Sequence, residues 1–91
     1  MTLTRGSFQH FDYDRMIVLF TMTDAATEVA CAISSAAMDG LEGKTGVKPA
    51  QREEQFLRLR DRIEERASHK FANHELEGHP PGVVLRSVDF R

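Results

Sequence analysis

The first third of the chain has short hydrophobic runs that are typical of β-strands. Residues 16–22 are rich in β-branched and aromatic side chains, and residues 27–33 place apolar side chains at every second position. Because only residues 23–26 join these two runs, we expect an antiparallel hairpin. A less regular run over residues 7–13 predicts a first strand.

The predicted strand over residues 16–22 is apolar on both faces. Val18 and Phe20 lie on one face, whereas Ile17 and Leu19 lie on the other. A strand of this kind needs cover on both sides, as an interior strand does. We expect one long helix to cover only one of these faces, so the pattern favours a contact between copies of the chain.

In the second half of the chain, apolar residues recur at the spacing of an α-helix. Ser34 or Ser35 can cap a short helix that includes Leu41. A long helix is predicted from about Pro49 to Asn73, because proline is favoured in a first turn. Steps of three and four then predict a stripe that packs on a core. This stripe comprises Phe56, Leu59, Ile63, Ala67 and either Lys70 or Phe71.

The order of these elements predicts the α+β class. Residues 74–82 are too rich in glycine and proline to continue a helix, and residues 83–90 predict a last strand. Since strands and helices are segregated in sequence, we predict a small antiparallel sheet of three to four strands, with one long and one short helix packed on one face. Residues 1–6 are expected to form a flexible N-terminus, and residues 7–91 a single α+β domain.

Composition and charge narrow the classes of function. A net charge of −2 argues against general affinity for nucleic acid. The longest apolar stretch, residues 16–20, is far shorter than the roughly 20 residues that span a bilayer. Residues 1–10 lack the apolar run of a signal peptide, and one cysteine cannot form an internal disulfide. We therefore expect a cytoplasmic protein without membrane contact.

Cys31 is the single candidate thiol. A reactive thiol needs a nearby cation or a helix N-terminus to lower its pKa. Val29 and Ile33 instead place Cys31 among apolar residues on one side of a strand. The sequence favours a buried, structural cysteine, with a redox or nucleophilic thiol as the alternative.

The histidines give no recognised metal site. His69, His74 and His79 are spaced by five residues, which matches no zinc signature. Glu75 and Glu77 could join His74 and His79 around an adventitious metal ion, but solvated loop residues are the simpler interpretation. We predict no metal and no cofactor.

Charges on the long helix separate by sign. Arg58, Arg62 and Arg66 lie on one flank of the apolar stripe, with His69 beyond them. Three interpretations remain: a solvated surface, a self-complementary dimer across a two-fold axis, and weak, salt-dependent phosphate binding. The opposite flank is acidic and comprises Glu53, Glu54, Asp61, Glu64 and Glu65.

With these residues in place, the chain resembles a family of small bacterial proteins known as domain of unknown function 1488. The resemblance runs from Phe8 to about Phe90 and depends mainly on hydrophobic patterning. It implies a small α+β fold and no particular activity. Its main positions are Val18, Phe20, residues 29–34, Ala37, Leu41, residues 56–67 and residues 82–85.

The leading hypothesis is a non-enzymatic accessory or protein-interaction domain that forms a homodimer or binds an unidentified protein. Its basis is the absence of any residue pattern for chemistry, together with apolar and charged surfaces that remain unused. The alternative is a weak nucleic-acid-binding module that uses Arg58, Arg62 and Arg66. A second alternative is a thiol- or metal-linked enzyme that uses Cys31, or His74 with His79.

Overall fold

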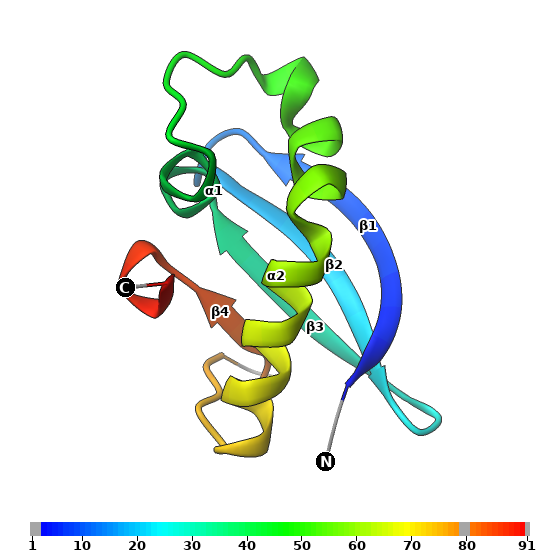
Figure 1. Ribbon diagram of the computed structural model, residues 1–91. Helices are drawn as coiled ribbons and strands as arrows, with labels where there is room; N and C mark the ends of the chain where they lie inside the picture. Colours follow the sequence, from blue (N-terminus) through cyan, green and yellow to red (C-terminus); the bar gives the residue numbers. More distant parts are fainter. Residues whose placement is uncertain (1–2, 79–80, 91) are drawn as a thin grey trace.

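A computed structural model describes residues 3–78 and 81–90 of the protein. These residues form a four-stranded sheet, two α-helices and two short 3-10 turns (Figure 1). The α+β class predicted from the sequence is confirmed. In chain order the elements are β1 (Thr4–Asp12), β2 (Ile17–Asp24), β3 (Thr27–Ser34), α1 (Ser35–Glu42), a first 3-10 turn (Pro49–Gln51), α2 (Arg52–Ala72), β4 (Val83–Leu85) and a C-terminal 3-10 turn (Ser87–Phe90).

The sheet is mixed, with the strand order β1-β2-β3-β4. Strands β1, β2 and β3 are antiparallel, as predicted, but β4 pairs with β3 in parallel, with Cys31 opposite Val83. The predicted antiparallel pairing is therefore corrected at the last strand. The reason is visible in Figure 1: α2 runs back along the sheet, so the chain enters β4 in the direction of β3. Such a crossover gives parallel neighbours.

The first strand begins earlier than the sequence predicted. Thr4 pairs with Thr23 of β2, and Leu3 is buried in the core. Thr4 to Gly6, which were expected to belong to a flexible N-terminus, therefore belong to β1. Gly6 is a poor strand former, so this part of β1 depends on its partner strand.

The C-terminal segment leaves the sheet after Leu85. The predicted strand over residues 83–90 divides into β4 and the C-terminal 3-10 turn. The Asp89 carboxylate accepts hydrogen bonds from the Arg86 backbone N–H at 2.7 Å and from Lys70 Nζ at 3.2 Å. These contacts bend the chain toward α2, because both donors converge on one side chain.

The short helix α1 begins and ends as its capping residues predict, whereas α2 begins three residues later than predicted. Ser34 caps α1, since its Oγ accepts a hydrogen bond from the Ala37 backbone N–H at 3.1 Å. Gly43 ends α1 in the left-handed conformation, with φ of 65°. Pro49 opens a 3-10 turn that leads directly into α2.

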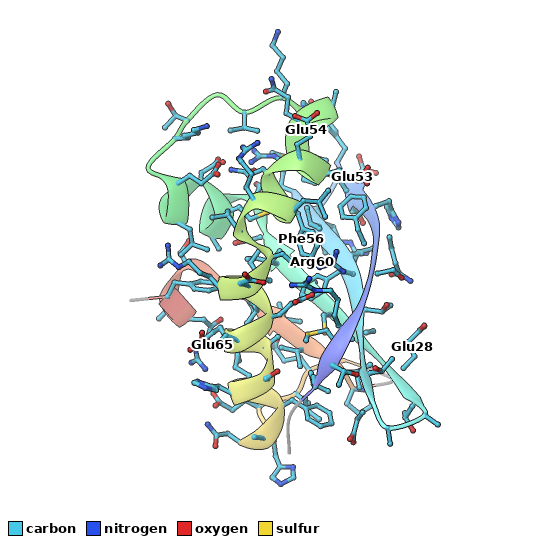
Figure 2. The ribbon with its side chains drawn as sticks, turned by 45° about the vertical axis from the view of Figure 1, so that its right-hand side comes forward. Glu28, Glu53, Glu54, Phe56, Arg60 and Glu65 are labelled. Carbon is cyan, nitrogen blue, oxygen red and sulfur yellow. The ribbon has the colours of Figure 1, made fainter. Side chains whose placement is uncertain are left out.

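The core lies between α2 and one face of the sheet. The predicted stripe of α2 is buried there, which confirms its orientation. The Phe56 ring lies 4.9 Å from the Phe20 ring and 5.7 Å from the Phe8 ring, measured between centroids. Figure 2 shows Phe56 and Arg60 between α2 and β1. The apolar side chains of β2 that meet the helix are Val18, Phe20 and Met22.

Gly82 allows the chain to enter β4 close to β3. A Cβ atom at Gly82 would lie 2.4 Å from the carbonyl oxygen of Ala30. We expect Gly82→Ala to lower the free energy of unfolding by about 1–3 kcal/mol, because the backbone must move to accept the methyl group. Urea denaturation followed by circular dichroism measures this change.

Gly40 provides the matched control for this prediction. It lies within α1, and a Cβ atom there would meet nothing within 4 Å. Gly40→Ala should therefore stabilise the protein by about 0.4–1 kcal/mol, because alanine restricts the unfolded chain. Equal effects at Gly40 and Gly82 would contradict the steric explanation.

Candidate interaction surface

The face of the sheet opposite the helices carries a small apolar centre. Successive side chains of a strand point to opposite faces, so the residues between the core positions face away from α2. Ile17, Leu19 and Val84 are partly exposed there, and Ala30 is exposed. We call this side the open face, defined by Ile17, Leu19, Ala30, Ala32 and Val84.

A shallow hollow of about 380 Å³ lies over the open face. Within the described residues, its lining comes from the strands and their flanking loops, and neither helix contributes to it. Most of its lining residues are apolar, and we call its charged lining residues the rim. The charged rim residues are Arg15, Glu77 and Arg86.

Each side of this hollow has an ion pair. Arg15 Nε lies 2.7 Å from Asp12 Oδ2, at the turn between β1 and β2. Arg86 donates two hydrogen bonds to the Glu77 carboxylate, at 2.7 and 2.9 Å, beside β4. Hydrogen bonding from Arg15 lowers the pKa of Asp12, and hydrogen bonding from Arg86 lowers the pKa of Glu77. Both carboxylates are therefore charged at neutral pH.

On each edge strand of the sheet, a cationic side chain of α2 binds one backbone carbonyl. Arg60 donates a hydrogen bond to the Gly6 carbonyl of β1 at 2.8 Å. Lys70 Nζ donates to the Val84 carbonyl of β4 at 2.9 Å. Since edge carbonyls are the groups that pair with another strand, these contacts oppose association through the edges.

Two of the three arginines on the predicted flank bind acceptors within the same chain. Arg58 pairs with Glu42 of α1 at 2.9 Å, and Arg66 donates to the Asp89 backbone carbonyl at 2.7 Å. These contacts hold α1 and the C-terminal 3-10 turn against α2. Arg62 lies between two shallow hollows that both include Phe90. Phosphate binding by these arginines remains a prediction, but two of them already have acceptors.

Cys31 lies in the core, as the sequence favoured. It is 3% exposed, and burial raises the pKa of its thiol to about 12. The thiolate, which is the reactive species, is therefore scarce at neutral pH.

We expect a maleimide or disulfide reagent to label Cys31 only when the protein unfolds. Labelling of native protein should be slow and should accelerate in urea along the unfolding transition. The Ala36→Cys variant adds a thiol at an exposed position of α1 and reports the rate for an accessible cysteine. Rapid labelling of native Cys31 at that rate would restore the thiol-enzyme hypothesis.

The histidine cluster does not form a metal site in the described residues. His69, His74 and Glu75 are exposed, and Glu77 pairs with Arg86 instead. Over residues 3–78 and 81–90, no group of three or more potential ligand side chains is close enough to hold a metal ion. His79 lies outside the described residues. In the same ranges, no helix has the length and hydropathy needed to cross a bilayer.

Sequence reasoning missed a buried polar network between α1 and α2. Arg52 is 4% exposed and donates to Asp39 Oδ1 at 2.7 Å and to Gln55 Oε1 at 2.6 Å. Its guanidinium also lies over the Phe11 ring. The signal was available, because Arg52 falls four residues before Phe56 and so extends the apolar stripe.

These features define a small α+β domain with a mixed sheet, helices on one face and a partly apolar open face. The chain belongs to the family described as "Protein of unknown function (DUF1488)", which matches residues 5–79. This confirms the resemblance found in the sequence. The comparison with curated proteins gave no match.

A solved structure supports the same fold. The chain is similar to the crystal structure of a DUF1488-family protein of unknown function from Shewanella loihica PV-4, with a TM-score of 0.74 and 19% sequence identity. The match covers 91% of this chain and 94% of that chain. At this identity, the similarity establishes the fold of the chain and no activity.

Proposed function

We propose that this protein is a non-enzymatic interaction domain that self-associates through its open face. The observation that supports the proposal most directly is the exposure of Ile17, Leu19 and Val84 at the centre of a sheet face. Removing such apolar surface from water is favourable by roughly 25 cal/mol per Å². A second copy of the chain can provide this cover.

Sheet geometry favours face-to-face packing. Two twisted sheets pack with their strands within about 30° of each other, and their apolar inner faces then form a shared core. Arg60 and Lys70 oppose the other route, which is pairing of edge strands. A standard interface of about 800 Å² per partner would use about one seventh of the 5552 Å² surface of this chain.

Sedimentation equilibrium over a range of concentrations tests the proposal. Wild-type protein should show a reversible increase in mass from one chain to two. Leu19→Lys should remain a monomer, because it places a charge at the centre of the open face. Its circular dichroism spectrum should match that of the wild type.

Leu57→Lys is the matched control. Leu57 is 47% exposed and lies on α2, away from the open face. This variant should dimerise like the wild type. Wild-type protein that stays monomeric at high concentration, or a Leu19→Lys variant that still dimerises, would overturn the proposal.

A further inference from the structure

We propose that the two copies pack about a two-fold axis parallel to the strands, so that the Asp12–Arg15 pair of each copy faces the Glu77–Arg86 pair of the other. This inference rests on the proposed function and deepens it. It specifies the symmetry of the dimer and the charged residues that select it.

The two pairs lie at opposite edges of the sheet. Asp12 ends β1 and is the cross-strand partner of Ile17, so it shares the open face with that residue. Arg86 follows β4 two residues after Val84 and lines the same hollow. Because β1 and β4 are the edge strands, the pairs face each other across the apolar centre.

The two pairs also lie at the same level along the strands. Ile17, the partner of Asp12, pairs in turn with Ser34 of β3. Arg86 directly follows Leu85, whose partner in β3 is Ile33. Continuing β4 in this parallel register places Arg86 near Ser34, which is also the position of Asp12. Glu77 bridges to Gly82 at the start of β4, and its carboxylate extends along β4 to the guanidinium of Arg86.

A two-fold axis parallel to the strands exchanges the edges and preserves the level. It places β1 of one copy across from β4 of the other, so that each ion pair meets the different ion pair. Arg15 of each copy can then approach Glu77 of the second copy, and Arg86 can approach Asp12. An axis across the strands would instead place Asp12 over Thr4, at the other end of β1.

The ion pairs select the arrangement while the apolar centre provides the affinity. The side chains of Arg15 and Arg86 are 66% and 53% exposed, so neither guanidinium is held in a buried contact. Exposed charge pairs contribute little binding energy each, but they disfavour arrangements that oppose like charges. Self-association in this geometry should therefore depend on the signs of the rim charges.

Charge reversal tests this symmetry. Arg15→Glu and Glu77→Arg should each weaken the homodimer, by about tenfold, because each substitution disturbs two symmetry-related contacts. An equimolar mixture of the two variants should recover the wild-type dissociation constant, because the acidic rim of one meets the basic rim of the other. The double variant Arg15→Glu/Glu77→Arg should dimerise at least as tightly as the wild type, with a stronger dependence on salt.

The outcomes separate this inference from the proposed function. In the alternative arrangement, each ion pair would face the equivalent ion pair of the second copy. The double variant would then oppose two acidic rims and two basic rims, and it would not dimerise. A wild-type dimer that Leu19→Lys abolishes and rim reversals leave unchanged would overturn the symmetry alone. A monomeric wild type would overturn both. Urea unfolding of each variant shows whether the fold survives, and Arg15→Gln and Glu77→Gln provide neutral versions that should weaken the dimer less.

Discussion

Replacing Phe56 with alanine is expected to lower the free energy of unfolding by about 3–5 kcal/mol. The Phe56 side chain is fully buried, and its ring contacts those of Phe8 and Phe20. Alanine would leave a cavity where the helix, β1 and β2 meet. Because a domain of this size is stabilised by only about 5–15 kcal/mol in total, the loss is a large fraction of its stability.

The neighbouring residue provides the control for Phe56→Ala. Leu57 is 47% exposed, so Leu57→Ala should change the free energy of unfolding by less than about 0.5 kcal/mol. Urea denaturation of both variants at one low protein concentration keeps any dimerisation from contributing to the difference. A similar loss in both variants would mean that α2 does not pack as the structure has it.

The elements that could be predicted are those with a strong local pattern. The strand β2 is recognisable from its β-branched residues, and the stripe of α2 is recognisable from its helical period. The direction of β4 could not be predicted, because three residues have no useful period and their pairing depends on where α2 ends. The start of β1 at Thr4 likewise depends on pairing with β2.

The candidate surface was predictable only in part. The sequence indicated that both faces of β2 are apolar, but tertiary packing decides which face remains open. The helices cover the face that carries the bulkier β2 side chains, including Phe20 and Met22. Ile17 and Leu19 remain on the open face. The Glu77–Arg86 pair was not predicted, since its residues meet only after the chain turns into β4.

The largest electrostatic effect on stability is expected at the buried Arg52. Asp39→Ala should lower the free energy of unfolding by about 3 kcal/mol, because it leaves a guanidinium that is 4% exposed without its carboxylate. Within the described residues, the Nε atom of Arg52 has no hydrogen-bond partner, so the hydrogen-bonding capacity of this guanidinium is already only partly satisfied. Gln55 alone cannot replace the lost negative charge.

Removing both charges should be much less harmful than removing one. In Asp39→Ala/Arg52→Met, an apolar side chain of similar length occupies the site of the guanidinium. We expect stability within about 1 kcal/mol of the wild type, because replacing a buried ion pair by apolar groups is often neutral. Urea unfolding of the wild type, both single variants and the double variant forms a complete thermodynamic cycle. Additive losses would contradict this explanation.

The pH dependence of the cycle provides an independent check. Burial raises the pKa of Asp39, but hydrogen bonds from Arg52 and Gln55 outweigh it, and the net pKa lies below the ordinary 3.8. The stability contributed by the Asp39 carboxylate is therefore fully present above this ordinary value and is lost as the pH falls through the folded-state pKa. The difference between the wild type and Asp39→Ala should shrink in that acidic range. A difference that is independent of pH would indicate that the lost contact is steric rather than electrostatic.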